Sequence, residues 1–478
     1  MVGSERGVAR TLGPLVLLAA IGCSFTTEDT GGCTQNADCR TAFGIGSRCL
    51  PSGFCSTEPL DARCMLRLPV GADDDPSLLA NAVPVATIVN RSLEGQEARA
   101  LSVELALSDA SAVGIEGRTF SLLVCTNEPD FEGDGVGRGD ATAALGAYLE
   151  ELGVVAIVGP PSSSDVQRIV PATSAPLLIS PSATSNALTD LDPVPASDMM
   201  PGRFWRTAAP DTQQGIRIAE DLIARAVPSL ALVHADDAYG RGLRDVVQNV
   251  LRERGASLIV TEHSFAEGDD ASFGDAVADA DAEAPAETLF ISSDVDVVSA
   301  FVTSAATLPR LSMASFFLTD SAGNEDFARS IQQNEAARTT CGRIRGTRPQ
   351  VAEGTVTNSF RSRYQLVFGD DPTVFGFAAN SYDAGWLVAV AAGWAIAQEG
   401  GDLAAANLAR GLRRISSGTQ LDLDRDDFAG ILEAFRRGDS VDVVGASGAL
   451  DYDPATEETA APTELWVIDG ECRFVVSP

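Results

Sequence analysis

Two clusters of small hydroxyl residues follow two neighbouring apolar runs, and together they could bind an anion. "GPPSSSDVQ" (159–167) comes directly after "LGVVAIV" (152–158), and "PSATSN" (181–186) comes directly after "PLLIS" (176–180). Unpaired backbone N–H groups at a helix N-terminus, with short hydroxyl side chains beside them, suit an anion such as a carboxylate.

The same side chains could instead cap the elements that follow. Ser162, Ser163 and Ser164 stand where a helix is expected to begin, and Thr184 stands at the next turn. Each cluster alone is explained by capping. Two clusters at the ends of adjacent parallel strands favour a site, because ligands of open α/β sheets bind at the carboxyl ends of strands.

Residues that could support catalysis lack the partners they need. The two histidines, His234 and His263, have no partnered Ser or Cys motif, and "GASG" (445–448) indicates a tight turn rather than a nucleophile elbow. No lysine occurs, which excludes Schiff-base and P-loop chemistry. A hydrolase is the least favoured interpretation. We expect a protein that is not an enzyme and that needs no cofactor.

One acidic pattern has the spacing of metal ligands. Asp422, Asp424, Asp426 and Glu433 fall at calcium-loop spacing, but Asp427 replaces the glycine that the sharp turn of such a loop requires. The stretch also reads as the polar start of a helix, "DDFAGILEAF". We therefore expect a solvated acidic helix start and no metal site.

The charge balance argues against nucleic acid as a partner. The chain has 478 residues, with 34 basic and 67 acidic ones, so its net charge is −33. Phosphate binding needs a basic face, and no basic cluster is visible.

The N-terminus has the features of an export signal. Arg6 and Arg10 precede "LGPLVLLAAIGCS", an apolar stretch that is too short to span a bilayer and suits a signal-peptide core. Its end, "AAIGC", resembles a bacterial lipobox, although Ala20 stands where leucine is usual. This predicts a signal peptide over 1–22 and a lipid on Cys23. The alternative is an ordinary secretory signal, with Cys23 in a disulfide.

The remaining cysteines fit an exported protein. Nine cysteines less Cys23 leave eight, an even number that suits disulfides outside the cytosol. Five of them, between Cys33 and Cys64, crowd into a segment with little apolar material, so disulfides must hold it. Zinc is the alternative, but the segment contains no C-x-x-C pair and no histidine.

From about residue 79 the chain alternates short apolar runs with helical patterns. "VPVATIV" (83–89) and "FSLLVC" (120–125) are typical of buried parallel strands, and the same rhythm restarts after "RFWRTAAPD" (203–211). Two such runs predict two doubly wound α/β lobes. The longest apolar run, "AGWLVAVAAGWAIA" (384–397), is too short to span a bilayer and predicts a buried helix.

Four spaced motifs carry a family resemblance. The chain resembles the type I periplasmic binding proteins of the branched-chain amino acid group, which are solute-binding lipoproteins of ABC transporters, over residues 79–478. The motifs are "GVVAIVGPPSSSDVQRIVPATSAPLLISPSATSNALT", "ADDAYGRGLRDVVQNVLRERGASLI", "VFGFAANSYDAGWLVA" and "VDVVGASGALDYD".

The resemblance implies a fold and a division into domains. Two parallel-sheet lobes are joined by a multi-stranded hinge and preceded by the small Cys-rich segment. The expected parts are a lipidated Cys-rich segment and linker over 23–78, lobe 1 over 79–207 and 348–420, and lobe 2 over 208–347 and 421–478.

The resemblance also implies where a ligand binds. Ser163, Ser182 and Thr184 occupy positions that are expected to hold the carboxylate of an amino acid. From lobe 2, Tyr239 is expected to pack on the ligand, and Asp294 or Asp320 to hold its ammonium group. The loop after the first strand, "NRSLEG", departs from the family in lacking an aromatic residue.

The implied function is extracytoplasmic capture of a small amino-acid-like ligand for an ABC importer. The expected partners are an amino acid or a related small carboxylate or amide, an ABC permease, and a membrane through the lipid anchor. An extracellular ligand sensor, or a surface protein that uses the same clamshell without transport, is the alternative.

Overall fold

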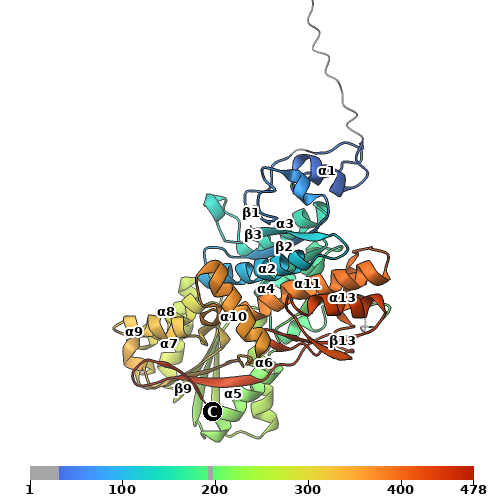
Figure 1. The fold of residues 1–478 in the computed structure, drawn as a ribbon. Helices are drawn as coiled ribbons and strands as arrows, with labels where there is room; N and C mark the ends of the chain where they lie inside the picture. The colour runs from blue at the N-terminus through green and yellow to red at the C-terminus, as the bar shows by residue number, and fades with distance from the viewer. Residues whose placement is uncertain (1–31, 57, 192–196, 478) are drawn as a thin grey trace, which may run out of the picture.

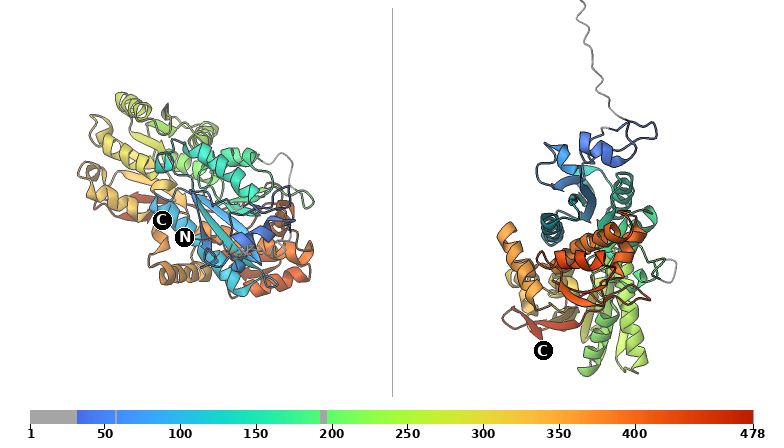
Figure 2. Two further views of the ribbon diagram at one scale, coloured as in Figure 1. Left: turned by 90° about the horizontal axis from the view of Figure 1, so that it is seen from above. Right: turned by 45° about the vertical axis from the view of Figure 1, so that its right-hand side comes forward.

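The computed structural model describes residues 32–56, 58–191 and 197–477. The expected signal peptide and the lipid acceptor Cys23 lie outside the described residues. Two α/β lobes make up most of the molecule, and a small Cys-rich module stands at the end of one lobe, far from the other (Figures 1 and 2). The predicted fold class is confirmed.

Disulfides hold the Cys-rich module, as expected. Its helix α1 (Asn36–Phe43) lies beside the bridges Cys33–Cys49 and Cys39–Cys55. A third bridge, Cys64–Cys125, ties strand β1 (Cys64–Leu68) to the first lobe, where β1 pairs antiparallel with β3. The close group of sulfurs from Cys33, Cys39 and Cys55 belongs to these bridges, so it offers no zinc site.

Lobe one is built on a six-stranded sheet with the order β1-β3-β2-β4-β5-β6. All neighbours after β1 pair in parallel, which places the carboxyl ends of these strands at one edge. The strands are β2 (Ala82–Val89), β3 (Thr119–Thr126), β4 (Ala156–Val158), β5 (Leu177–Ser180) and β6 (Phe204–Arg206), and the helices between them are α2 (Glu94–Val113), α3 (Arg138–Glu151) and α4 (Ser163–Ala172).

Lobe two is built on a seven-stranded sheet with the order β16-β15-β11-β10-β9-β7-β8. The strands are β7 (Ser229–Ala235), β8 (Ile259–Phe265), β9 (Glu287–Ile291), β10 (Ser315–Leu318), β11 (Ile344–Pro349), β15 (Thr463–Ile468) and β16 (Phe474–Ser477). The helices are α5 (Thr212–Ala224), α6 (Ala238–Glu253), α7 (Asp270–Glu283), α8 (Val295–Ala305) and α9 (Glu325–Gln333). The C-terminal strands β15 and β16 belong to this sheet, and Cys341–Cys472 links their hairpin to it.

A long section of chain between the two visits to lobe two packs back on lobe one. It comprises α10 (Thr355–Phe368), α11 (Ala378–Gln398), α12 (Ala405–Leu412), α13 (Phe428–Arg436) and a small sheet of β12 (Thr419–Asp422), β13 (Val441–Gly445) and β14 (Gly448–Ala449). The apolar run at 384–397 lies inside α11 and is buried, as expected. Within the described residues, no helix has the length and apolar character needed to cross a membrane.

The packing favours a lobe boundary different from the one expected. Leu423, Ile431 and Val443 lie in the same buried cluster as β2, α2 and α11, and this cluster ends with Tyr452. The second lobe has its own clusters, one of which includes Phe290. Residues 421–452 thus pack with lobe one, whereas the expected division gave 421–478 to lobe 2. The division into 79–207 with 348–420 and 208–347 with 421–478 stays a proposal, and the contacts favour ending lobe one after Tyr452.

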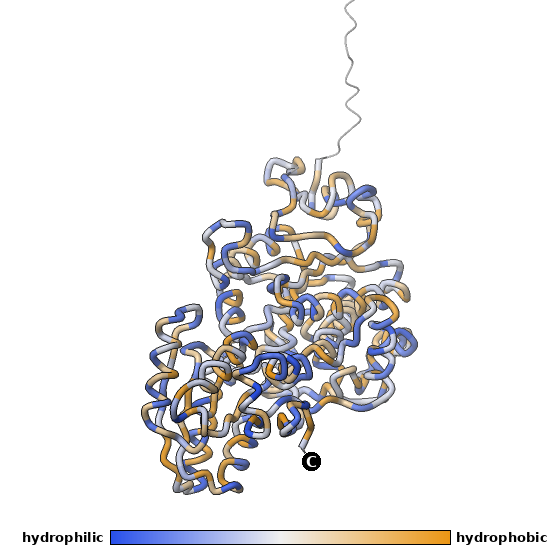
Figure 3. Tube along the Cα trace, turned by 90° about the vertical axis from the view of Figure 1, so that its left-hand side faces the viewer, coloured by the Kyte–Doolittle hydropathy of each residue, from blue (hydrophilic) through white to orange (hydrophobic). Residues whose placement is uncertain are grey.

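In the described part of the chain, three passages join the lobes: 207–211, 350–354 and 450–462. Gln350 N donates to Pro462 O at 2.8 Å, so the second and third passages lie side by side. Hydrophobic and hydrophilic residues are interspersed along both lobes (Figure 3), and each lobe buries its own apolar clusters. Each lobe therefore has the core it needs to move as a unit about these passages.

Candidate functional site

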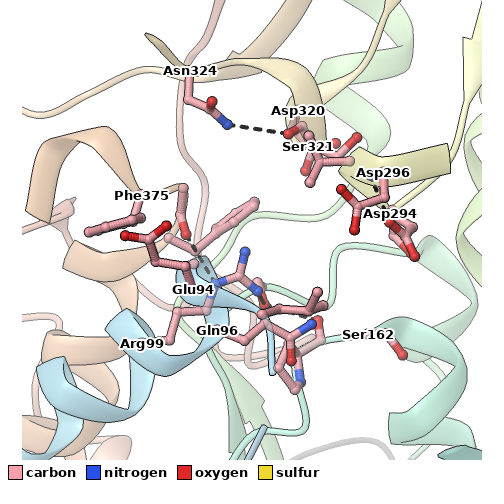
Figure 4. A pocket seen from close by; sticks show the side chains of 18 of the residues that line it. Glu94, Gln96, Arg99, Ser162, Asp294, Asp296, Asp320, Ser321, Asn324 and Phe375 are labelled. Atoms are coloured by element: carbon pink, nitrogen blue, oxygen red, sulfur yellow. Dashed lines mark hydrogen bonds between the residues drawn. The ribbon is translucent and has the colours of Figure 1, made fainter. Parts of the chain in front are cut away.

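A cleft of about 450 Å³ lies where lobe one faces lobe two. Lobe one contributes the start of α2, the first turn of α4 and the loop after β5, and lobe two contributes the starts of α6 and α8 and the loop after β10. The segment before α11 completes the wall. Side chains from these elements point toward a common space (Figure 4).

All six residues that the sequence singled out for ligand binding line this one cleft. Lobe one provides Ser163, Ser182 and Thr184, and lobe two provides Tyr239, Asp294 and Asp320. The structure brings them together from five separate chain segments. Their contact with a ligand stays a prediction.

In the first serine cluster, one residue caps helix α4 and the next residue is available to a ligand in the cleft. Ser162 is the N-cap of α4, where its hydroxyl accepts a hydrogen bond from Asp165 N at 3.1 Å. Ser163, one residue on, accepts a hydrogen bond from Ser185 N at 3.2 Å, which joins the two clusters. A hydroxyl that accepts one bond can still donate its proton to an anion. Ser162 therefore acts as a helix cap, whereas the Ser163 hydroxyl can still donate a hydrogen bond to a ligand in the cleft.

The second cluster positions an arginine that the sequence did not single out. Ser182 Oγ donates to Pro161 O at 2.9 Å and accepts from Arg99 Nη1 at 3.0 Å, and Arg99 Nε donates to Gly376 O at 3.0 Å. The Arg99 guanidinium also lies over the Phe377 ring, 5.2 Å from its centroid. Because the Ser182 proton is already donated, Arg99 offers the remaining donors at this end of the cleft.

Arg99 forms no ion pair with any carboxylate that the structure describes. Among the described residues, no carboxylate lies within 4 Å of its nitrogens. Burial lowers the pKa of Arg99 to about 10, while the negative charge of Asp320 across the cleft opposes that shift. Arg99 therefore stays protonated at neutral pH and can receive an anion.

A buried carboxyl group lies behind the lobe-one wall. Thr184 is 4% exposed, and its carbonyl accepts from Asp211 N at 2.8 Å. Neither carboxylate oxygen of Asp211 has a well-aligned hydrogen-bond partner in the part of the chain that the structure describes. Burial raises the pKa of Asp211 well above its usual range, and the charge of Asp320 raises it further. The protonated form of Asp211 is therefore favoured.

Across the cleft, Tyr239 and Asp320 form one unit. The Tyr239 hydroxyl donates a short hydrogen bond to Asp320 Oδ1, and Gln214 Nε2 donates to the same oxygen at 3.5 Å. Burial raises the pKa of Asp320, whereas these two hydrogen bonds and the charge of Arg99 lower it. Tyr239 therefore holds the Asp320 carboxylate in place, in addition to any packing contact that it makes with a ligand.

Asp294 has a structural task as well as a place in the cleft wall. Its side chain is the N-cap of α8 and accepts from Asp296 N at 2.8 Å and from Val297 N at 3.5 Å. A carboxylate has more acceptor sites than these two bonds use. Asp294 can therefore cap the helix and still face a cation.

The lobes are held against each other beside the cleft. Arg138 of lobe one lies 3.2 Å from Asp165 Oδ2 and 2.6 Å from Glu267 Oε1, and Glu267 belongs to lobe two. The Ser185 hydroxyl donates to Ala238 O of α6 at 2.7 Å. These contacts describe a closed arrangement, in which the two walls touch directly.

The calcium-like spacing near the third sheet forms a turn. Asp424 Oδ1 accepts from the backbone N of Asp426 and of Asp427, at 2.9 and 3.0 Å, and Asp427 accepts from Asp422 N. The carboxylates thus bond the backbone that leads into α13, in agreement with an acidic helix start.

Sequence reasoning missed Arg99 and Phe377 for a physical reason. Arg99 lies in the second turn of α2, and only the packing of that helix decides that its side chain reaches the cleft. Phe377 comes from a distant segment and has a left-handed backbone, with φ of 66°. The motif "VFGFAAN" (374–380) carried part of the family resemblance, but it did not indicate that Phe377 lies beside Arg99.

Comparisons with known proteins agree with this architecture. The model of a family described as periplasmic binding protein matches residues 95–435. No protein with a curated description matches the chain.

Three solved structures are similar to the chain at low identity. A leucine-binding protein from Thermotoga maritima is 15% identical, over 83% of this chain and 98% of its own, with a TM-score of 0.61. The substrate-binding protein LivJ from Streptococcus pneumoniae, in complex with isoleucine, is 17% identical over 83% and 98%, with a TM-score of 0.59. A solute-binding protein from R. palustris, in complex with benzoate, is 15% identical over 83% and 95%, with a TM-score of 0.60. At such identities the likeness shows a shared fold.

Proposed function

The chain belongs to the periplasmic binding protein family, and we propose that it captures a small amino-acid-like ligand between its lobes and delivers it to an ABC importer. The family is one of binding proteins and not of enzymes, in agreement with the lack of a nucleophile motif. One observation carries the proposal: hydroxyl groups and Arg99 line one wall of a single cleft, and aspartates line the other.

The lobe-one wall suits a carboxylate. Arg99 provides a fixed, charged donor, and Ser163 and Thr184 stand beside it at the carboxyl ends of β4 and β5. Charge-assisted hydrogen bonds of this kind are about twice as strong as neutral ones. In the closed cleft they strengthen further, because water is excluded.

The lobe-two wall suits the ammonium group of the same ligand. Asp320, fixed by Tyr239 and Gln214, faces Arg99 across the cleft, and Asp294 stands at the start of α8. A zwitterion would satisfy both walls at once and would hold the lobes together. Two similar structures carry isoleucine and benzoate, so the fold accommodates both an amino acid and an aromatic carboxylate.

The proposed place of action is outside the cytoplasm, with the protein held at a membrane through a lipid on Cys23. The lipobox-like "AAIGC" and the eight cysteines that form four bridges support an exported protein. Membership of the branched-chain amino acid group rests on the four motifs. A sensor with the same clamshell would bind its ligand in the same way.

A thermal-shift screen tests the proposal. The purified chain is heated with L-amino acids, their amides and small carboxylates, benzoate included. Each compound is tested over a range of concentrations that reaches about 100 times the Kd of a ligand that binds. A ligand that binds only the folded state should add about 2.7 kcal/mol to the free energy of unfolding. The variant Arg99→Gln should lose most of that gain. If no amino acid, amide or carboxylate raises the melting temperature, the proposal is wrong.

A further inference from the structure

The two walls of the cleft carry unequal charge. Four aspartates line the lobe-two side, namely Asp294, Asp296, Asp320 and Asp326, and no arginine lines that side among the described residues. On the lobe-one side, Glu94 and Asp165 are matched in number by Arg99 and Arg138. The lining as a whole is therefore acidic.

Ion pairs neutralise some of the charged side chains that line the cleft, and other charged side chains there form no ion pair. Asp326 pairs with Arg329 at 2.5 Å, and Arg138 pairs with Asp165 and Glu267. Within the described ranges, Glu94, Asp294, Asp296 and Asp320 have no basic group within 4 Å, and Arg99 has no acidic one. Four carboxylates and the Arg99 guanidinium thus have no ion-pair partner in that part of the chain, and Asp294 among these carboxylates also interacts with the charge of Arg138.

Two of these carboxylates, Asp294 and Asp320, are half-buried in the cleft, whereas Glu94 and Asp296 are exposed in this closed arrangement. Asp294 and Asp296 lie together at one side of the space, and Asp320 lies beside them, with Arg99 reaching in from α2 (Figure 4). Burial raises the pKa of Asp296, and the neighbouring Asp294 carboxylate raises it further. Neighbouring carboxylates disfavour each other's ionised form, so a cation placed beside Asp294 and Asp296 would be stabilised.

The acidic composition of the chain does not account for this pattern. The protein carries 67 acidic residues, and an exposed unpaired aspartate is ordinary on its surface. For the half-buried Asp294 and Asp320 the lack of an ion-pair partner costs more, because the two lobes remove part of their water and no basic side chain of the described residues replaces it. An amino acid with a single ammonium group would neutralise only one of the carboxylates.

We propose that the ligand is an amino acid with a second, cationic group on its side chain, such as ornithine or lysine. The inference rests on the proposed function and narrows it. Arg99 and the hydroxyls hold the carboxylate, Asp320 holds the α-ammonium group, and Asp294 with Asp296 receives the side-chain cation at the start of α8. The cleft of about 450 Å³ lies in the range typical of small-ligand sites.

Calorimetric titration with two isosteric amino acids tests the inference. L-ornithine and L-norleucine have side chains of the same length and shape, and only ornithine ends in an ammonium group. The wild type should bind ornithine at least about tenfold more tightly than norleucine, because a charge-assisted contact is lost with norleucine. Raising the NaCl concentration should weaken ornithine binding more than norleucine binding.

Two aspartate variants test whether the preference for ornithine over norleucine arises in the cleft. Asp296→Asn removes an exposed charge and should reduce the preference for ornithine about threefold. Asp294→Asn keeps a residue that caps helices well and should reduce it about tenfold. Asp279→Asn, an exposed aspartate on α7 away from the cleft, is the matched control and should leave both affinities unchanged.

Each result decides between the two proposals. If norleucine or leucine binds as tightly as ornithine, the cationic ligand is wrong and the amino-acid-binding function stands. If neither ornithine nor norleucine binds, the cationic ligand is wrong, and the thermal-shift screen alone decides whether the amino-acid-binding function stands. If ornithine is preferred but Asp294→Asn and Asp296→Asn leave the preference unchanged, the assignment of the side-chain cation to these aspartates is wrong.

Discussion

At the scale of single residues, the site depends on hydroxyl groups that have alternatives to ligand binding. Thr184→Val replaces the hydroxyl by a methyl group of the same shape in a side chain that is 4% exposed. If Thr184 donates to a carboxylate, the change should cost about 1.5 to 3 kcal/mol of binding free energy, measured by calorimetric titration with the screened ligand. Thr288→Val, at a buried threonine of β9 outside the cleft, is the control. Unchanged affinity with a lowered melting temperature would show that Thr184 is only structural.

A second prediction at this scale concerns Asp211, whose pKa burial raises well above its usual range. As the pH rises above about 4, the unfolded chain loses the Asp211 proton and the folded chain keeps it. The free energy of unfolding therefore falls with rising pH until the pH passes the folded pKa. Asp320 and Asp237 favour the shift, and Thr184 and Arg206 oppose it.

The variant Asp211→Asn cannot titrate and isolates this effect. Between pH 5 and pH 8 the wild type should lose more free energy of unfolding than the variant, measured by denaturant unfolding at both pH values. Other titrating groups act in both proteins and cancel in the comparison. An equal loss in the two proteins would mean that Asp211 ionises in the folded state.

At the scale of elements, the contact between α6 and lobe one decides whether the cleft closes. A Cβ atom placed on Gly242 of α6 would lie 2.7 Å from Ser185 Oγ of lobe one. Gly242→Val should therefore hold the lobes apart and weaken ligand binding about tenfold or more, because fewer molecules reach the closed state. Small-angle scattering with ligand present should show a larger molecule for the variant than for the wild type. Gly274→Val, where a Cβ meets nothing within 4 Å, is the control. Wild-type affinity in Gly242→Val would contradict this role of α6.

Elements of the fold were predictable to different degrees. Alternating apolar runs predicted the strands and helices of both lobes, because a buried parallel strand reads as a short continuous apolar segment. The pairing of β1 with β3 was not predictable, since it depends on the distant bridge Cys64–Cys125. Likewise, α13 was expected in lobe 2 but packs against α11 and α2, a choice that only tertiary contacts decide.

For the site, the sequence predicted the hydroxyl clusters and the acidic residues and missed the guanidinium between them. Parallel strands bring their carboxyl ends to one edge, so Ser163, Ser182 and Thr184 were expected to lie close together. Which side of α2 faces the cleft was not evident, because much of that helix is buried. Arg99 therefore emerges only from the structure.

At the scale of the whole molecule, we expect the Cys-rich module to follow a lipid anchor on Cys23. Cys23→Ser should leave the signal uncleaved or release the protein in soluble form, because a lipid chain supplies about 0.8 kcal/mol per buried CH₂ group. Fractionation of cells and mass spectrometry of the N-terminal peptide measure the change. A wild-type protein that is found soluble and without lipid would contradict the anchor.

The proposed function requires one cleft that holds a carboxylate on lobe one and a cation on lobe two. A crystal structure of the protein with the tightest ligand from the screen tests this most directly. We predict that the ligand carboxylate lies within hydrogen-bond distance of Arg99 and of the Ser163 or Thr184 hydroxyl, and that its ammonium group contacts Asp320 or Asp294. A ligand bound outside this cleft, or one whose carboxylate faces lobe two, would show that the proposed site is wrong.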